Sequence, residues 1–279
     1  MIAKLLDISP DEYHRRPGLS SSTARTLLER SPLHAWTEHG AYGAKGKPPT
    51  KATDLGSVGH ALVLGKGARF VVLPYEDYRK AAAQAARDEV RAAGLIPLLE
   101  AEHAKAVLLA NEVRIRLSEC GIELDGTSEA VIEWHEESEH GPVLCRSMMD
   151  HVWLDDGRIL DLKFVSDASM ASVERSAERY GYAIQAAAYT RALSALRPEH
   201  AGRTEFVFAF CETTDPYAIN LSTPSGPFYE LGDRRWCRGV AEWSRCQKDN
   251  RWPAYGHEIN RISPPEWVLR REGFIEEEM

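Results

Sequence analysis

Two apolar segments joined by a tight turn place the strongest constraint on the fold. Residues 145–154 and 158–165 are rich in apolar and β-branched side chains, and Asp155-Asp156-Gly157 between them is typical of a β-hairpin turn. Just before them, residues 128–134 follow the period-two pattern of a strand. These segments predict three consecutive strands in the middle of the chain.

Helical patterns surround these strands. We also expect a fourth strand at residues 204–212 and a mobile loop at the Gly-, Pro- and Lys-rich residues 40–53. The helices are expected at residues 22–36, at residues 54–64, as a hairpin of two between residues 75 and 117, at residues 172–196 and at residues 228–248. This order indicates one mixed α/β domain, residues 1–279, with a central mixed sheet flanked by helices.

Composition and charge limit the class of protein. No apolar stretch approaches the roughly 18 residues of a membrane helix, and the N-terminus lacks the pattern of a signal peptide, so we expect a cytoplasmic protein without a membrane partner. Five widely spaced cysteines are typical of reduced thiols. The net charge of −8 argues against a general nucleic-acid coat, but it allows an enzyme with a local basic path.

The hairpin brings three charged residues together. Asp161 and Lys163 are two residues apart in the second strand, so both side chains project from one face. If Asp155-Asp156 forms the loop, Asp150 stands opposite Asp161. If Asp156-Gly157 forms it, Asp150 stands opposite Lys163. Both registers leave the three side chains on the same face, where directly opposed Cβ atoms are about 4.5–5.5 Å apart.

This arrangement indicates a metal-dependent site for phosphodiester chemistry. Two carboxylates this close repel each other unless a positive charge lies between them, and a divalent cation with oxygen ligands would supply it. Such a set can polarise a phosphodiester and activate a water molecule. Lys163 would either orient or help deprotonate that water, or stabilise the pentacovalent phosphorus. The other interpretation is a solvated hairpin face, but the strand around Asp161 is strongly apolar, where charges need partners.

These residues resemble the D…(D/E)xK signature of the PD-(D/E)xK nuclease superfamily. Residues 56–60 (GSVGH) look like the GxxxH motif of its RecB-like branch, and Gln185-x-x-x-Tyr189 looks like its QxxxY motif. Glu129 is placed like the acidic residue on the preceding strand. The sequence around these motifs resembles even more closely the RecE-type exonuclease domain (exodeoxyribonuclease VIII), from the RecB/lambda exonuclease branch. The similar stretches include YHRRPGLSSSTARTLLERSP and RYGYAIQAAAYTRAL.

The resemblance implies a fold and a set of site residues. It implies a restriction-endonuclease-like core at about residues 54–215, a helical N-terminal elaboration at about 13–36 that handles the DNA end, and a C-terminal helix and tail at 228–279. The catalytic residues would be Asp150, Asp161, Lys163, Glu129, Gln185 and Tyr189, the metal ligands His60, Asp150, Asp161 and Leu162, and the residues for the 5′-phosphate or DNA Arg16, Ser21, Ser22 and Tyr182.

The resemblance also implies an activity. RecE-type enzymes digest one strand of linear duplex DNA from its 5′ end and leave a 3′ overhang for recombination by strand annealing. By resemblance, Mg²⁺ is the expected cofactor, with Mn²⁺ as a substitute. The expected partners are linear double-stranded DNA ends, a RecT-like annealing protein and further copies of the chain in a homo-oligomeric ring, a tetramer or a trimer.

Alternatives exist for the function and for single residues. The chain could instead be a structure-specific or single-strand nuclease of the same superfamily, or a catalytically silent DNA-binding or assembly subunit. Tyr189 could simply pack in the core, and the serines before residue 22 could cap a helix. The HEESEH segment at residues 135–140 spaces its histidines five apart, not the four of a zinc-binding HExxH helix, so we expect an acidic loop.

Overall fold

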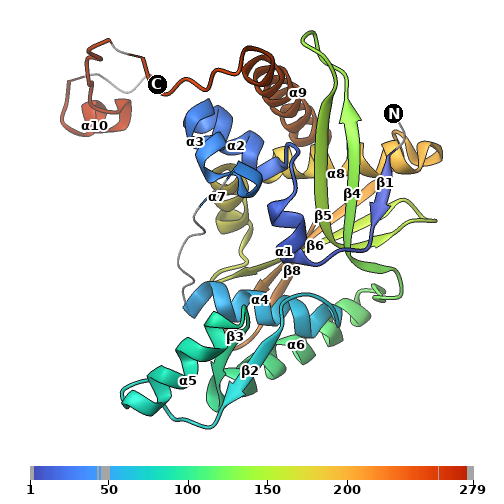
Figure 1. Ribbon diagram of the computed structural model, residues 1–279, viewed down its shortest axis with the longest axis vertical. Helices are drawn as coiled ribbons and strands as arrows, with labels where there is room; N and C mark the ends of the chain where they lie inside the picture. Colours follow the sequence, from blue (N-terminus) through green and yellow to red (C-terminus); the bar gives the residue numbers. More distant parts are fainter. Residues whose placement is uncertain (1–2, 43, 45–50, 257, 275–279) are drawn as a thin grey trace.

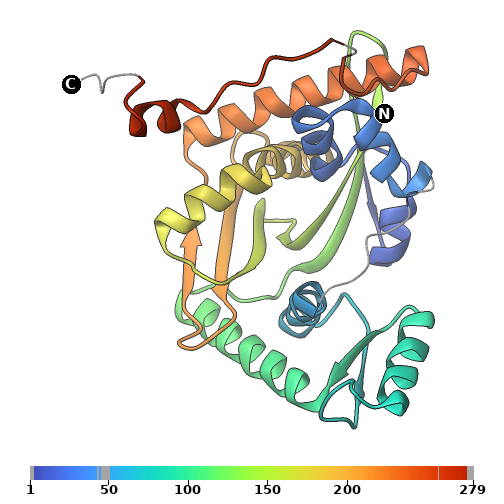
Figure 2. The same ribbon diagram turned by 90° about the vertical axis from the view of Figure 1, so that its left-hand side faces the viewer.

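The computed structural model describes residues 3–42, 44, 51–256 and 258–274. Within these residues a mixed β-sheet lies at the centre and helices cover both of its faces (Figures 1 and 2). The predicted mixed α/β class, with a central mixed sheet flanked by helices, is confirmed. None of the helices in the described residues combines the length and the apolar character needed to cross a membrane.

The central sheet contains the four predicted strands and two short edge strands that the sequence pattern did not reveal. The strands of this sheet, in spatial order, are β1 (Lys4–Leu6), β4 (Thr127–Glu136), β5 (Val143–Trp153), β6 (Arg158–Val165), β7 (Glu205–Glu212) and β8 (Ile219–Ser222). β6 and β7 run parallel, while the other neighbours are antiparallel. A parallel pair needs a long crossover, and the helices between β6 and β7 supply it.

Each face of the sheet has its own hydrophobic core. On one face the aromatic side chains of β7 pack with Trp236 and Trp243, which are both fully buried. The opposite face packs against helices through Leu160 and Leu162 of β6. The helices of the first face include α2 (Ser21–Glu29), α8 (Tyr182–Leu196) and α9 (Gly226–Asp249), and those of the second are α4 (Lys51–Leu64) and α6 (Glu100–Glu119). A layer of helices therefore packs on each face of the sheet.

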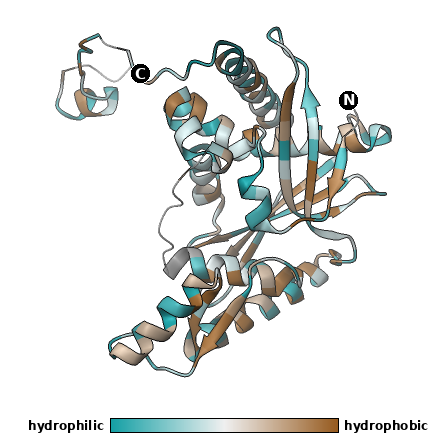
Figure 3. Cartoon of the chain, in the orientation of Figure 1, coloured by the Kyte–Doolittle hydropathy of each residue, from teal (hydrophilic) through white to brown (hydrophobic). Residues whose placement is uncertain are grey.

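The predicted helical hairpin between residues 75 and 117 is wrong. The chain instead forms β2 (Phe70–Leu73), α5 (Ala81–Ala92) and β3 (Ile96–Leu99), with β2 and β3 in a small parallel sheet, before α6 begins at Glu100. Both short strands are hydrophobic along most of their length (Figure 3). Four apolar residues after Gly94 carry too little pattern to distinguish a strand from the start of a helix, so the pairing decides.

Two predicted helices are each divided in two. The segment 22–36 breaks at Ser31, whose hydroxyl caps α3 (Pro32–Glu38), and Pro32 is the first residue of that helix. The segment 172–196 breaks at Gly181, which adopts a left-handed conformation with φ of 68° between α7 (Met170–Tyr180) and α8. The short helix α1 (Pro10–Arg15) was not predicted.

The remaining segments give mixed outcomes. Half of the predicted loop at 40–53 lies outside the described residues, and the rest includes a 3-10 turn, η1 (Gly40–Tyr42), and the start of α4 at Lys51. The predicted acidic loop at 135–140 is wrong in its first part, because His135 and Glu136 end β4. The predicted helix at 228–248 is confirmed as α9. Beyond it, an extended segment leads to α10 (Glu266–Arg271), which lies away from the sheet (Figure 1).

Candidate active site

The hairpin of β5 and β6 changes its pairing at Asp150. Main-chain pairing runs from Trp153–Arg158 to His151–Leu160, and one further step in this register places Asp150 opposite Asp161. This is the first of the two predicted registers. Oδ2 of Asp150 accepts a hydrogen bond from the main-chain N–H of Leu162 at 2.7 Å. In a regular sheet the N–H of Leu162 would donate to a main-chain carbonyl of the neighbouring strand, but here it donates to the carboxylate of Asp150.

A cavity of about 470 Å³ opens at this point. It collects side chains from the sheet, from α4 on one face and from α8 on the other. Most of the predicted metal and catalytic residues line it, namely His60, Glu129, Asp150, Asp161, Leu162, Lys163 and Gln185, and so does Tyr182, which was predicted to contact the DNA. Because these residues span more than 120 positions of the chain, their convergence is a product of the tertiary fold.

Asp161, Lys163 and Gln185 form a closed polar triangle. The ammonium group of Lys163 contacts Oδ2 of Asp161 in an ion pair. Gln185 donates from Nε2 to Oδ1 of Asp161 at 2.6 Å and accepts from Nζ of Lys163 at 3.0 Å. The lysine also lies over the ring of Tyr182, 4.7 Å from its centroid. These contacts hold the cation at a fixed position beside the carboxylates.

Burial perturbs the carboxyl groups of the cavity. Burial raises the pKa of Asp150 to about 6 and that of Asp161 to about 6, although the nearby Lys163 opposes both shifts. Burial opposes the charge on Lys163 as well, but Asp161 and Asp150 together raise its pKa. Two buried carboxylates facing one ammonium group leave an excess of negative charge, which a further cation would stabilise.

Glu129 lies on β4, directly beside Asp150 of the neighbouring strand β5. In the register between β4 and β5, Ser128 pairs with His151 and Ala130 with Met149, so Glu129 and Asp150 occupy facing positions. Glu129 is 8% exposed, and burial together with Asp150 raises its pKa to about 7. It also has a positive φ of 51°, which costs a non-glycine residue free energy and often occurs at functional sites.

His60 approaches from α4. Its Nδ1 lies 3.5 Å from Oδ2 of Asp150, and its ring meets Phe164 edge-on at 5.0 Å between centroids. Burial lowers the pKa of His60 to about 4, so the imidazole is neutral at pH 7 and retains a lone pair for a metal or a hydrogen bond. A side chain at Gly59 would lie 3.1 Å from the ring of Phe164, so the glycine permits this close approach of α4 to β6.

The donor set suits a hard divalent cation. Mg²⁺ is commonly bound by one or two carboxylates and keeps several water molecules. Asp150 and Asp161 could supply those carboxylates, with Glu129 and His60 beside them. Among the residues that the structure describes, no group of three His, Cys, Asp or Glu side chains surrounds a single point closely enough to hold a metal alone. The carboxylates therefore suit a divalent cation that keeps several of its water ligands.

Tyr189 occupies a different place from Gln185. It is 8% exposed and belongs to the core beneath the sheet, and its hydroxyl donates to the main-chain oxygen of Met148 at 2.7 Å. It is not among the residues that line the carboxylate cavity. This position agrees with the core-packing alternative, in which Tyr189 positions β5 two residues before Asp150, but Tyr189 also lines a second cavity beside the first.

The predicted phosphate residues are separated in the fold. The guanidinium group of Arg16 donates to both carboxylate oxygens of Glu133, at 2.6 and 3.0 Å, and Arg16 lines none of the cavities described here. Ser21 and Ser22 instead line a smaller cavity of about 210 Å³ together with Arg25. This smaller cavity adjoins the carboxylate cavity through shared walls, formed by His14, Met148 and Gln185.

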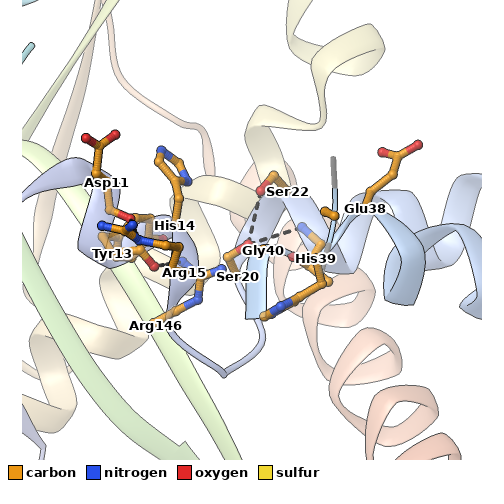
Figure 4. Close-up of a pocket in the computed structure, with 12 residues that line it drawn as sticks. Asp11, Tyr13, His14, Arg15, Ser20, Ser22, Glu38, His39, Gly40 and Arg146 are labelled. Atoms are coloured by element: carbon orange, nitrogen blue, oxygen red, sulfur yellow. Dashed lines mark hydrogen bonds between the residues drawn. The ribbon is translucent and has the colours of Figure 1, made fainter. Parts of the chain in front are cut away.

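A third cavity, of about 530 Å³, lies between the N-terminal segment and β5 (Figure 4). Arg146 forms part of its wall, is only 4% exposed, and donates to the main-chain oxygens of Tyr13 and Gly18 at 2.7 and 3.2 Å. It ties the start of the chain to the sheet. Sequence reasoning missed it, although it lies on the same face of β5 as Asp150, four residues away.

Comparison with known proteins identifies the family of the chain. The family model for a PDDEXK-like domain of unknown function (DUF3799) matches residues 20–264. A crystal structure of a proposed exonuclease from Eubacterium rectale is similar, with a TM-score of 0.59 and 11% identity over 97% of this chain and 100% of that one. At this identity the likeness shows the fold alone.

A phage-related exonuclease from Haemophilus somnus 129PT also aligns, with 11% identity over 86% of this chain and 99% of that one, but its TM-score of 0.34 carries no argument. No protein with a curated description matches the sequence. The family model spans most of the chain and includes every cavity residue from His60 to Gln185. The chain therefore belongs to the family of PDDEXK-like domains of unknown function, DUF3799, within the PD-(D/E)xK nuclease superfamily.

Proposed function

We propose that this chain is a divalent-metal-dependent nuclease that hydrolyses phosphodiester bonds in DNA. The observation that carries the proposal is the triangle of Asp161, Lys163 and Gln185 beside Asp150 and Glu129 in one cavity. Buried carboxylates next to a fixed lysine are what a site needs to bind a cation and to stabilise charge that develops on a phosphate. Membership of the PDDEXK-like family supports the same conclusion.

Each side chain has a distinct part in this proposal. A bound Mg²⁺ would polarise the phosphodiester and make water a better nucleophile, and Asp150 and Asp161 would hold it. Lys163 would donate hydrogen bonds from Nζ to the attacking water or to a phosphate oxygen. Gln185 would hold the side chains of Lys163 and Asp161 at fixed positions through its two hydrogen bonds. His60, which is neutral at pH 7, would hold the carboxylate of Asp150 in its orientation.

The finer proposal is digestion of linear duplex DNA from the 5′ end, leaving 3′ overhangs. The smaller cavity beside the carboxylates supports it, because Ser21, Ser22 and Arg25 offer hydroxyl groups and a cation where a terminal phosphate would need them. Arg25 replaces Arg16 in this proposal, since the latter is engaged with Glu133. The homo-oligomeric ring and the RecT-like annealing partner, both implied by resemblance, stay predictions.

The test compares DNA substrates and a matched pair of variants. Purified protein with Mg²⁺ is incubated with linear duplex, closed circular duplex and single-stranded DNA, labelled at either the 5′ or the 3′ end. We expect linear duplex to lose nucleotides from the 5′ end, and Lys163→Ala to lower the rate by at least about 100-fold. Lys105→Ala, on α6 outside the carboxylate cavity, is the control and should cleave like the wild type.

The outcomes separate the alternatives. Cleavage of closed circles, or of single strands alone, would favour a structure-specific or single-strand nuclease with the same site. Binding of DNA without cleavage under any metal would favour a catalytically silent subunit. If Lys163→Ala digested duplex DNA as fast as the wild type, the assignment of the active site would be wrong.

A further inference from the structure

An aromatic column runs from the core to the solvent beside the carboxylate cavity. Phe208 is 4% exposed and stacks on Tyr182, with 5.5 Å between ring centroids and 29° between planes. Tyr182 stacks in turn on Tyr180, at 5.9 Å and 28°. Tyr180 ends the column and is 48% exposed. An aromatic side chain that is stacked on one side and open to solvent on another has a surface available for a further flat group.

The backbone holds Tyr180 in this position. It is the last residue of α7, and Gly181 after it adopts a left-handed conformation that turns the chain into α8. Arg25 of α2 donates from Nη1 to the main-chain oxygen of Tyr180 at 2.8 Å. A side chain at Gly181 would lie 2.7 Å from Cδ of Arg25, so the glycine allows this contact. The ring therefore stands on a fixed support and not on a free loop.

Tyr180 also lies next to the groups that would bind a DNA strand. It lines the smaller cavity together with Ser22, Arg25 and Gln185. Tyr182, its stacking partner, lines the carboxylate cavity. The guanidinium group of Arg179, an exposed side chain, lies over the Tyr180 ring at 5.6 Å from its centroid, so a base that stacks there would displace this cation toward a neighbouring phosphate. An aromatic ring flanked by arginines is the combination with which proteins bind unpaired nucleotides.

We propose that Tyr180 is a positioning residue whose ring stacks on the nucleobase of the terminal nucleotide of the strand being cleaved. This inference rests on the proposed nuclease function and adds the subsite that holds the base. Arg179 and Arg25 would face the phosphates on either side of that base. Stacking of this kind is tolerant of sequence, because every base has a π-face, so the subsite would position the strand end without selecting a base.

The first measurement is steady-state cleavage by three variants. Loss of stacking in Tyr180→Ala should raise KM about tenfold and leave kcat within about twofold, because the ring binds the strand but touches no reacting atom. Tyr180→Phe retains the ring and should retain wild-type KM. Tyr255→Ala removes another exposed tyrosine, 64% exposed and outside these cavities, and should behave like the wild type.

The second measurement removes the base instead of the ring. Binding to a duplex with an abasic terminal nucleotide is followed by fluorescence anisotropy in EDTA, where no cleavage occurs. The wild type should bind this end about tenfold more weakly than an intact end. Tyr180→Ala should show almost no difference between the two ends, because the partner of the base is already absent.

The outcomes distinguish this inference from the function on which it rests. If the wild type cleaves DNA but both proteins lose the same affinity on the abasic end, stacking by Tyr180 is overturned and the nuclease stands. If the wild type discriminates against the abasic end and Tyr180→Ala does not, while neither protein cleaves, stacking stands and the nuclease is overturned. A wild type that neither binds nor cleaves DNA overturns both.

Discussion

Asp161 is the most deeply buried carboxylate of the cavity, at 1% exposed. Its Oδ2 contacts the ammonium group of Lys163, yet this buried atom makes no hydrogen bond of good geometry. A carboxylate in this state gains more from a cation ligand than one that is fully hydrogen-bonded. The side chain is therefore the best place to test whether a metal binds here at all.

Mg²⁺ should stabilise the folded protein through Asp161. At about 100 times the dissociation constant, a ligand of the native state adds about 2.7 kcal/mol to the free energy of unfolding, or roughly 5 °C or more in Tm for a domain of this size. We expect that rise for the wild type in Mg²⁺ relative to EDTA, measured by thermal unfolding without DNA. Asp161→Asn should lose it.

The matched control comes from the turn of the same hairpin. Asp156 is exposed, and Asp156→Asn should retain the full response to Mg²⁺. An equal rise in Tm for Asp161→Asn and the wild type would place the metal elsewhere.

The sequence predicted part of this site at the level of single residues. Asp161 and Lys163 followed from the period of a strand, and the tight turn at Asp155-Asp156 brought Asp150 opposite Asp161, on the same face as Lys163. The place of Arg25 could not be predicted, because its contact with Tyr180 depends on how α2 packs beside the end of α7. Helical spacing left the place of Tyr189 open between the site and the core, because spacing alone does not say which neighbours a side chain meets.

At the scale of elements, Glu136 joins β4 to two helices. It accepts from Arg191 of α8 at 2.8 and 2.6 Å, from Nε1 of Trp134 at 2.8 Å and from Nε1 of Trp236 of α9 at 3.3 Å. Its side chain is 11% exposed. Burial is the largest single influence and opposes the charged form, but the hydrogen bonds from Arg191, Trp134 and Trp236 and the charge of Arg191 together outweigh it, so the pKa of Glu136 is lowered. The segment expected to be a loop thus contains a structural anchor.

Glu136→Gln should destabilise the fold by about 2 kcal/mol at pH 7, because it removes the buried carboxylate that accepts from Arg191 and leaves this arginine paired with the more exposed Asp233 alone. A carboxyl group whose pKa is lowered in the folded state stabilises the protein above its unfolded pKa of about 4.5, and this stabilisation disappears as the pH falls through the folded value. Urea unfolding from pH 7 to below 4.5 should therefore show the difference between variant and wild type shrinking with acid.

A surface pair provides the control for this measurement. Glu242 and Arg245 of α9 form an ion pair at i and i+3, with side chains 30% and 45% exposed. Glu242→Gln should change the unfolding free energy by less than about 0.5 kcal/mol at any of these pH values. A pH-independent penalty for Glu136→Gln would show that packing, and not charge, holds β4 to the helices.

At the scale of the whole molecule, the sequence predicted the layers but not all of the connections. The central strands and the covering helices followed from hydrophobic periodicity, which reports burial of a face. The parallel pair of β2 and β3 did not, because pairing between short apolar segments is decided by contacts far along the chain. The domain limits and the oligomeric ring stay predictions. With a net charge of −8, the DNA binding that we propose would depend on local cations and not on the overall electrostatic field.

Arg25 is the arginine of the smaller cavity, where we propose that a 5′-phosphate binds. Its side chain is 30% exposed, lies 3.7 Å from Glu29, and lines the cavity with Ser21 and Ser22. Arg25→Gln keeps amide donors for the main chain of Tyr180 but removes the charge. If a 5′-phosphate binds here, the wild type should bind 5′-phosphorylated duplex more tightly than 5′-hydroxyl duplex. The variant should lose about tenfold of that preference, since hydrogen bonds to charged groups contribute about 1.5–3 kcal/mol.

Arg30→Gln, at the end of the same helix and paired with Glu38, is the control for general charge loss. Removal of any phosphate-binding cation weakens DNA binding and flattens its salt dependence, but only a cation at the 5′ pocket changes the ratio between the two kinds of end. The ratio is therefore measured at several salt concentrations for wild type and both variants. An unchanged ratio in Arg25→Gln would remove the support for digestion from the 5′ end. The carboxylate site would then fit a nuclease of another polarity.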